Sequence, residues 1–190
     1  MATVTDPPRC IGVVLAGGLS TRMGRDKAML DWHGRPLIER QLDALRASGV
    51  DDVRVSGDRP DYRGIADAQP QLGPLGGLAG VADAVAIGVD LLVVPVDMPM
   101  LSAALLYRLR REHPQARGLR CAGHVLPLRL HLDEACRAFV RTLLKQREPH
   151  RRSLRALQQA VGCEELALDP VETSQLLDCN TEAIWNEVSR

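Results

Sequence analysis

Aromatic residues are scarce in this chain of 190 residues, which has one phenylalanine, two tyrosines and two tryptophans. Aliphatic side chains must therefore supply the core, and the length suits one domain that buries a sizeable core. Net charge is lacking too, because 24 basic residues balance 24 acidic ones. This balance gives no support for a nucleic-acid partner or for binding to a membrane surface.

Long hydrophobic runs and paired cysteines are also absent. No apolar run approaches the ~20 residues that span a bilayer, and residues 1–9 lack the apolar region of a signal peptide. The five cysteines are odd in number, no two stand at CxxC spacing, and the five histidines are scattered. The sequence thus shows no zinc motif, and we expect reduced thiols and a cytoplasmic protein.

Lysine is the scarcest charged residue. Of the 24 basic residues, 22 are arginine and only Lys27 and Lys145 are lysine. A lysine ammonium is a compact point charge that suits a phosphate, whereas an arginine guanidinium is a wide planar fork. Lys27, which closes the stretch GVVLAGGLSTRMGRDK at 12–27, is therefore a candidate phosphate ligand.

What is present is an alternation of strand-like and helix-like segments. The continuous apolar runs at 11–16 and 90–96 predict strands buried on both faces, and 51–57 alternates like a third strand. One or two short strands are expected between 118 and 132, and another near 163–168. Helices are expected at 36–49, 74–88, 102–113, 133–146, 151–162 and from about Thr181. This pattern predicts an α/β fold, a single Rossmann-like domain with a mostly parallel twisted sheet flanked by helices.

The loop from Ala16 to Lys27 follows the first predicted strand. Gly17 and Gly18 permit close approach of the backbone to a ligand, and consecutive amides can cradle phosphate oxygens. Ser20 adds a hydrogen-bond donor, and Arg22 and Lys27 add positive charge. The loop matches neither GxxxxGK[ST] nor GxGxxG, so an ordinary glycine-rich turn is the alternative.

Two further features follow predicted strands. Asp97 ends a buried strand just before Met-Pro, where it can hold a cation, because Mg²⁺ prefers one or two carboxylates with water and phosphate oxygens. The alternative is that Asp97 caps the next turn. The glycines of DAQPQLGPLGGLAG, residues 67–80, can bring bare backbone against a flat group such as a purine. Here the alternative is a helix start that needs small residues.

Together these motifs resemble those of a known family. The stretches LAGGLSTRMGRDK, GRPLIERQ, GPLGGL and VPVDMP, with a weaker LLDCNTEAIW, are similar to those of the molybdenum cofactor guanylyltransferases of the MobA type, within the nucleotidyltransferase superfamily. The similarity is close over residues 11–101 and loose over 102–175. Gly18 and Asp26 resemble the guanylyl branch more than the cytidylyl branch.

This resemblance implies transfer of GMP from GTP to the phosphate of molybdenum-bound molybdopterin, with Mg²⁺ as cofactor and pyrophosphate as the second product. It implies a nucleotide-binding part at about 10–101 and an acceptor-binding part at about 102–190. Catalytic roles fall on Lys27, Arg22 and Asp97, and Asp97 is the implied metal ligand. The implied binding residues are Leu15, Ala16, Gly17, Gly18, Ser20, Lys27, Ser56, Asp67, Gly73, Pro74, Leu75, Gly76, Asp97 and Asn180. A protein that delivers molybdopterin or a molybdoenzyme that receives the product is a further possible partner.

The chain departs from the family pattern at two positions. Ser56 stands where the family often has asparagine, and Asp178 replaces the first asparagine of the Asn-x-Asn-Thr motif, of which Asn180 remains. An anionic Asp178 would repel the pterin phosphate unless a donor or a metal intervenes. The basic run KQREPHRRSLR, residues 145–155, either gathers an anionic ligand or is a solvated surface.

The favoured mechanism is in-line displacement at the α-phosphorus of GTP. The pterin phosphate is already anionic, so no general base is needed, and catalysis rests on positioning and charge compensation. One alternative is another nucleotidyltransferase, either a molybdopterin cytidylyltransferase or one that acts on a sugar phosphate. A second alternative is a GTP-binding module that delivers cofactor without turnover.

Overall fold

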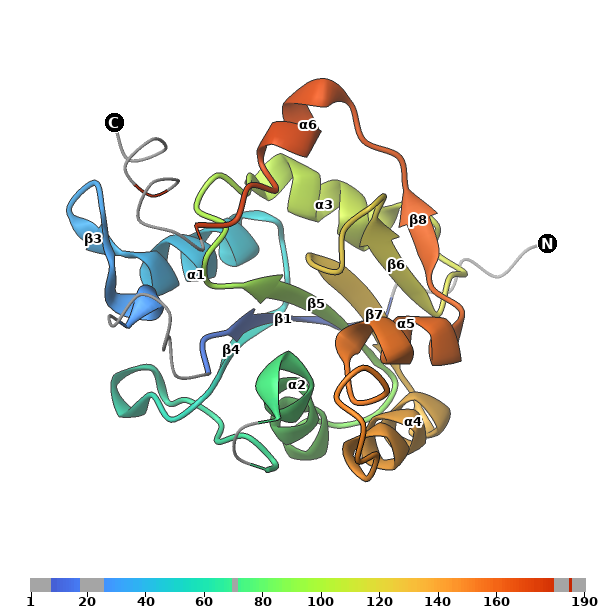
Figure 1. The fold of residues 1–190 in the computed structure, drawn as a ribbon. Coiled ribbons are helices and arrows are strands. Elements are labelled where there is room, and N and C mark those ends of the chain that lie inside the picture. The colour runs from blue at the N-terminus through green and yellow to red at the C-terminus, as the bar shows by residue number, and fades with distance from the viewer. Residues whose placement is uncertain (1–7, 18–25, 70–71, 180–184, 186–190) are drawn as a thin grey trace.

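The computed structural model describes residues 8–17, 26–69, 72–179 and Trp185. Its centre is a six-stranded sheet in the order β4-β1-β5-β7-β6-β8 (Figure 1). The strands are β1 (Cys10–Leu15), β4 (Asp52–Ser56), β5 (Val89–Pro95), β6 (Gly118–Cys121), β7 (Leu128–Leu132) and β8 (Glu164–Leu166). The expected strands at 11–16, 51–57, 90–96 and 163–168 are confirmed within one or two residues, and the uncertain region 118–132 holds two strands.

Five of the six strands run in one direction. β1 pairs in parallel with β4 and β5, and β6 pairs in parallel with β8, whereas β7 is antiparallel to both β5 and β6. The prediction of a mostly parallel sheet is confirmed. The antiparallel strand follows from a connection of only six residues between β6 and β7, which is too short for a parallel crossover.

Helices cover both faces of the sheet, so the central strands are apolar on both sides (Figure 1). On one face, Val14 packs in a cluster with residues of α1 (Leu37–Ala47) and α3 (Ala103–Arg111). On the other face, Val13 packs with residues of α2 (Gly73–Ala84), α4 (Glu134–Leu144) and α5 (Leu154–Val161). The continuous apolar runs of β1 and β5 are thus explained by burial on two faces.

Side-chain caps set the starts of three of these helices. Ser102, Asp133 and Ser153 each accept a hydrogen bond from a backbone N–H of the following turn. The expected helices at 102–113, 133–146 and 151–162 are therefore confirmed with slightly shorter bounds. The helix expected at 74–88 ends at Ala84, because Val85 is already extended.

Short elements complete the fold. They are the 3₁₀ turns η1 (Lys27–Met29) and η2 (Pro60–Tyr62), the hairpin of β2 (Asp31–Trp32) and β3 (Arg35–Pro36), and α6 (Pro170–Ser174). The sequence did not predict them, because each is too short to show periodicity. The helix expected from Thr181 lies outside the described residues, apart from Trp185, which is helical. In the part of the chain that is described, no helix is long and apolar enough to cross a membrane.

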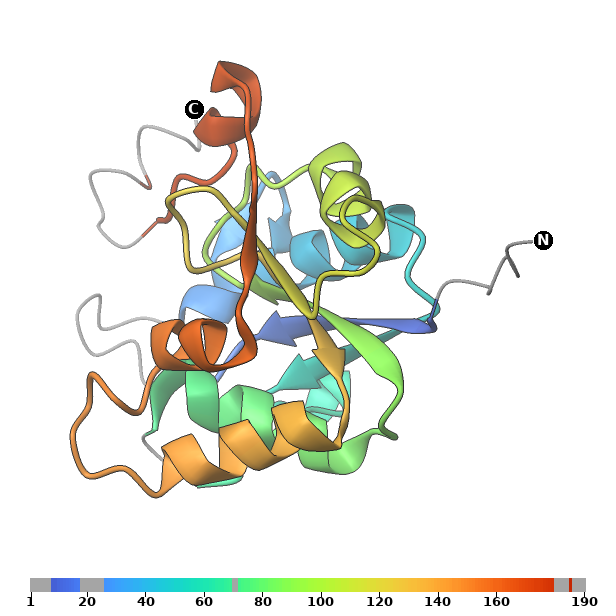
Figure 2. The same cartoon turned by 90° about the vertical axis from the view of Figure 1, so that its right-hand side faces the viewer.

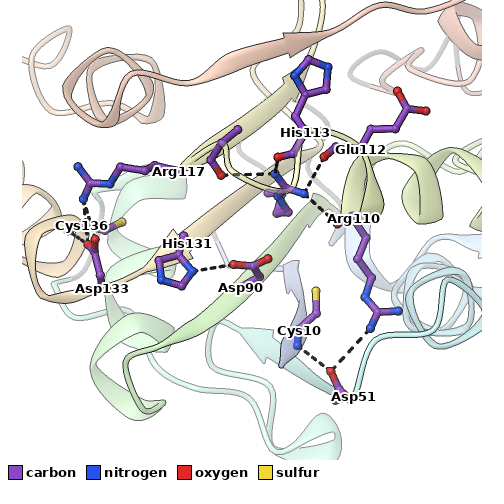
Figure 3. Close-up of polar contacts among 12 residues, drawn as sticks. Cys10, Asp51, Asp90, Arg110, Glu112, His113, Arg117, His131, Asp133 and Cys136 are labelled. Carbon is purple, nitrogen blue, oxygen red and sulfur yellow. Dashed lines mark hydrogen bonds and ion pairs between the residues drawn. The ribbon is translucent and has the colours of Figure 1, made fainter. Parts of the chain in front are cut away.

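A polar network lies at the amino ends of β1 and β5 (Figure 3). His131 pairs with Asp90 at 2.9 Å, and Asp51 accepts a hydrogen bond of 2.7 Å from the backbone N–H of Cys10. Arg129 of β7 is 2 % exposed and donates to the carbonyls of residues 110, 112, 113 and 116, at and beyond the end of α3. The guanidinium therefore pairs with the carbonyl of Arg110 in the last turn of α3 and with three carbonyls of the connection that follows the helix.

Candidate active site

Three neighbouring strands end side by side at the opposite edge of the sheet. Leu15, the last residue of β1, is in register with Ser56 of β4 and with Pro95 of β5. The residues that follow, among them Gly17 and Asp97, therefore start from one edge. In open α/β sheets this carboxyl edge is where ligands bind.

Lys27 and Asp97 meet at this edge. The Nζ atom of Lys27 lies 3.0 Å from Oδ2 of Asp97, and the two side chains are 15 % and 20 % exposed. Lys27 is the first residue of η1, whose N-cap Asp26 accepts a 3.1 Å hydrogen bond from the backbone N–H of Ala28. Two residues that lie 70 positions apart, and that the sequence assigned to phosphate and metal, thus form an ion pair.

The C-terminal motif lies beside this pair. The backbone N–H of Cys179 donates a 2.8 Å hydrogen bond to the carbonyl of Asp97. Burial raises the pKa of the Cys179 thiol to about 11, and the negative charges of Asp97 and Asp178 add to the effect. Trp185 meets Trp32 of the β2–β3 hairpin edge to face, with ring centroids 5.8 Å apart. Cys179 is therefore tied to Asp97, and Trp185 to the hairpin that follows η1.

Asp67 projects between two glycines. Its Oδ1 is buried, no described residue hydrogen-bonds to it, and burial raises the pKa of the carboxyl. A Cβ atom on Gly17 would lie 3.0 Å from this oxygen, and a Cβ on Gly77 would lie 3.3 Å from it. Asp67 is thus a hydrogen-bond acceptor held against the backbone that follows β1 and against α2.

Ser56 is buried between β4 and α2. The residue is 1 % exposed, and its Oγ has no hydrogen-bond partner among the described residues. A Cβ on Gly77 would come within 2.2 Å of that Oγ. A buried hydroxyl without a partner costs free energy, so Ser56 is a group that a bound ligand or a water molecule would satisfy.

The glycines of the 67–80 segment pack mainly against the protein itself. Gly76 and Gly77 are buried in the first turns of α2, and side chains there would meet Leu72, Ser56 or Asp67. A helix start that needs small residues therefore accounts for these two positions. In the stretch GPLGGL, Gly73 (φ +61°) and Pro74 are exposed at the N-terminus of α2, and the four residues after them are buried. Backbone contact with a base stays a prediction.

The structure places the predicted residues that it describes in two groups, with Lys27 against Asp97 and with Ser56 and Asp67 against the glycines of the neighbouring backbone. Both backbone polar groups of Ala16 already have hydrogen-bond partners within the protein. Its N–H donates to the carbonyl of Ser56 at 3.0 Å, and its carbonyl accepts from the Arg59 guanidinium at 3.0 and 3.2 Å. Leu15 forms part of the sheet, and Leu75 is buried at 1 % exposure. Gly18, Ser20, Arg22 and Asn180 lie outside the described residues, so their roles stay predictions. Arg59 and Asp26 are the site residues that the sequence did not assign.

The donor set at Asp97 suits a hard cation that brings its own ligands. Across the described residues, no three side chains of histidine, cysteine, aspartate or glutamate are placed to hold a metal together. A single carboxylate at a strand end leaves the remaining positions to water and substrate phosphates, as Mg²⁺ sites commonly do. Asp97 therefore fits the metal ligand that the sequence assigned, with Lys27 against one of its two oxygens.

Comparison of the sequence with known proteins identifies the family of this chain. The family model of the MobA-like NTP transferase domain matches residues 12–162. A protein of Xanthomonas euvesicatoria pv. vesicatoria, described as "Molybdenum cofactor guanylyltransferase", is 48% identical over 177 residues, which are 93% of each chain. The similarity to this family found in the sequence motifs is thus confirmed.

Two solved structures share the fold. The molybdopterin-guanine dinucleotide biosynthesis protein A of Archaeoglobus fulgidus superposes with a TM-score of 0.73 at 16% identity, over 94% of this chain and 96% of that one. A protein of Mycobacterium tuberculosis H37Rv, crystallised in complex with manganese, superposes with a TM-score of 0.62 at 19% identity, over 95% and 97% of the two chains. From the sequence matches, with a fold that agrees, the chain belongs to the MobA-like NTP transferase family, among the molybdenum cofactor guanylyltransferases.

Proposed function

We propose that this protein transfers GMP from GTP to the terminal phosphate of molybdenum-bound molybdopterin and releases pyrophosphate. The observation that carries the proposal is the Lys27–Asp97 pair, placed by η1 and β5 at the edge where β1 ends. A cation and a hard oxygen ligand within 3.0 Å of each other form a small site for a polyphosphate and its metal. The 48% identical relative carries a name that agrees with this substrate pair.

The chemistry needs few groups. An anionic oxygen of the pterin phosphate attacks the α-phosphorus of GTP, a new P–O bond forms, and the bond from that phosphorus to the bridging oxygen of pyrophosphate breaks. Lys27 faces the charge that grows on the leaving group, and Arg22 is proposed to do the same. A Mg²⁺ ion held by Asp97 would supply further charge compensation at the phosphate oxygens. No proton has to be removed from the nucleophile, so the site requires no general base.

Asp67 and the start of α2 are proposed to hold the nucleoside. The carboxylate of Asp67 keeps an unused acceptor oxygen, and guanosine offers N–H and O–H donors to match it. The exposed Gly73 and Pro74 lie at the start of α2, where the helix leaves backbone N–H groups unpaired. The N–H groups of this turn, to which Pro74 adds none, can donate hydrogen bonds to the acceptors of a base edge without a side chain in the way.

The acceptor is proposed to bind on the part formed by residues 102–190. The basic run at 145–155 forms the connection between α4 and the start of α5, and Figure 2 shows this connection on the side toward which β1 points. In it, Arg151 pairs with Glu148 at 2.8 Å, while Arg147 and Arg155 add positive charge. Such a loop suits an anionic pterin. A delivery protein, a recipient molybdoenzyme and a cytoplasmic location stay predictions.

One incubation tests the proposal. The protein is mixed with molybdenum-loaded molybdopterin, Mg²⁺ and an equimolar mixture of GTP and CTP, and the products are examined by mass spectrometry together with a pyrophosphate assay. We expect the guanine dinucleotide and an equal amount of pyrophosphate. A dinucleotide formed only from CTP would assign the protein to the cytidylyl branch, and GTP binding without pyrophosphate would make it a delivery module.

A further inference from the structure

Arg59 joins two parts of the chain that flank the Lys27–Asp97 pair. Its Nε and Nη2 donate to the carbonyl of Ala16, at the end of β1, over 3.2 and 3.0 Å. The same guanidinium forms a two-pronged ion pair with Asp26, in which Nη2 donates to Oδ1 at 2.7 Å and Nη1 donates to Oδ2. The Arg59 side chain is 19 % exposed. One residue therefore fixes the N-cap of η1 to the end of β1.

The loop that carries Arg59, residues 57–65, is held in place by backbone hydrogen bonds and close packing. The N–H of Gly57 donates to the carbonyl of Ile65, and the N–H of Gly64 donates to the carbonyl of Arg59, each at 2.8 Å. Gly57 has φ +113°, and a Cβ there would lie 2.8 Å from the Cα of Gly17. The loop thus packs backbone to backbone against the residue that follows Ala16, and only glycine permits this approach.

The contacts continue from Arg59 to the proposed phosphate ligand. Asp26 caps η1 through the N–H of Ala28, and Lys27 is the first residue of that turn. The hydrogen bonds from Arg59 hold the pKa of Asp26 below its ordinary value, so this carboxyl stays anionic. Asp26 is 41 % exposed beside Lys27, and without Arg59 its charge would oppose a bound polyphosphate. Arg59 therefore both orients η1 and compensates Asp26.

We propose that Arg59 is a positioning residue for nucleotidyl transfer, which holds Lys27 in place through Asp26 and cancels the Asp26 charge next to the nucleotide phosphates. The inference rests on the proposed function, in which Lys27 meets those phosphates. It assigns two separable effects to one side chain. Orientation of Lys27 governs kcat, and charge compensation governs the KM for GTP.

The test compares four variants with the wild type in steady-state pyrophosphate release, with circular dichroism as a check of folding. Arg59→Ala should raise the KM for GTP and lower kcat, each by about tenfold to a hundredfold, because charge-assisted hydrogen bonds are lost. Arg59→Ala with Asp26→Asn should restore KM and leave kcat low. Arg59→Lys keeps the positive charge but lacks the planar fork of the guanidinium. We expect this variant to recover the wild-type KM more fully than the wild-type kcat. Arg63→Ala, exposed on the same loop, is the matched control and should behave as the wild type.

The outcomes separate this inference from the proposed function. If Arg59→Ala has the same KM and kcat as the wild type, the proposed role of Arg59 is overturned. If adding Asp26→Asn to Arg59→Ala does not lower the raised KM, the charge effect is overturned. The wild type is assayed first with GTP, CTP, UTP and ATP. Turnover with another nucleotide refutes only the guanylyl assignment, and the variants are then compared with that nucleotide. Absence of turnover with all four refutes both.

Discussion

Substitution of Gly80, in the middle of α2, tests how closely this helix packs on the backbone of Asp67, the residue proposed to hold the nucleoside. A Cβ there would lie 2.3 Å from the carbonyl oxygen of Ala66 and 3.3 Å from the backbone N of Ala68. These residues flank Asp67, and the N–H of Ala68 also donates to the carbonyl of Gly76 at 3.2 Å. Glycine at position 80 thus lets α2 lie directly against the backbone that carries Asp67.

The expected cost of Gly80→Ala follows from two opposing effects. Atoms need roughly 3.5 Å of separation, so the helix and the 66–68 backbone must move apart by about 1 Å. Overpacking of this kind costs about 1–3 kcal/mol, and a backbone carbonyl that cannot rotate away places the value near the upper end. Alanine regains about 1 kcal/mol of helix propensity. The net loss of unfolding free energy should be about 2 kcal/mol, or a Tm lower by roughly 4–8 °C.

Urea unfolding followed by circular dichroism measures the stability, and GTP-dependent pyrophosphate release measures the site. The movement of Asp67 should raise the KM for GTP with little change in kcat, since binding in the ground state and in the transition state is weakened alike. Ala84→Gly, at the exposed end of the same helix, reports the propensity effect without the clash. A Gly80→Ala protein as stable as the wild type would refute the close packing of α2 on this backbone.

The remaining predictions concern the charged groups and the base. Lys27→Ala should lower kcat and kcat/KM together by roughly 10²-fold or more, because its charge matters most as the leaving group forms; a raised KM at normal kcat would contradict this. Asp97→Asn should keep the circular dichroism spectrum and lose activity at ordinary Mg²⁺, since an amide is a poorer ligand; full activity at ordinary Mg²⁺ would show that Asp97 is not the principal ligand. GTP should exceed CTP in kcat/KM by about a hundredfold or more, because two unpaired buried polar groups cost roughly 1–3 kcal/mol each; equal rates would move the protein out of the guanylyl branch. Arg129→Met should lower the unfolding free energy by about 3 kcal/mol in a urea titration, because buried carbonyls lose their donor; a change of less than about 0.5 kcal/mol would show that water replaces the guanidinium.

The sheet, and with it the edge at which the site is proposed, followed from the sequence because burial leaves a strong pattern. The runs at 11–16 and 90–96 are apolar at nearly every position, which is what a strand covered on both faces requires. Once these strands are parallel neighbours, the residues after them must share one edge. The meeting of Lys27 and Asp97 is a consequence of that topology.

The parts that the sequence did not reveal depend on contacts between side chains far apart in the chain. Arg59 is one of 22 arginines, and no period or motif separates it from the others before the fold places it beside Ala16 and Asp26. Arg129 occupies a strand position that alternation would expose, yet it is buried against the end of α3. For Gly76 and Gly77 the sequence left open a ligand contact or a helix start, and the structure shows that they, like Gly80, leave room for Ser56, Ala66 and Asp67.

The two ion pairs at the carboxyl edge agree with a proposed site that uses few chemical groups. Asp97 is paired with Lys27, and Asp26 is paired with Arg59, so each carboxylate already faces a cation from a distant part of the chain. Each pair also fixes the position of a charge, since η1 is held at its N-cap by one pair and through the Lys27 side chain by the other. A reaction whose nucleophile is already anionic needs fixed charge rather than proton transfer, and charges that are oriented before the substrate arrives need no reorganisation as the leaving group develops. The fold therefore fixes the positions of these two cations, and Arg59 lies one contact beyond the residue that is proposed to meet the nucleotide.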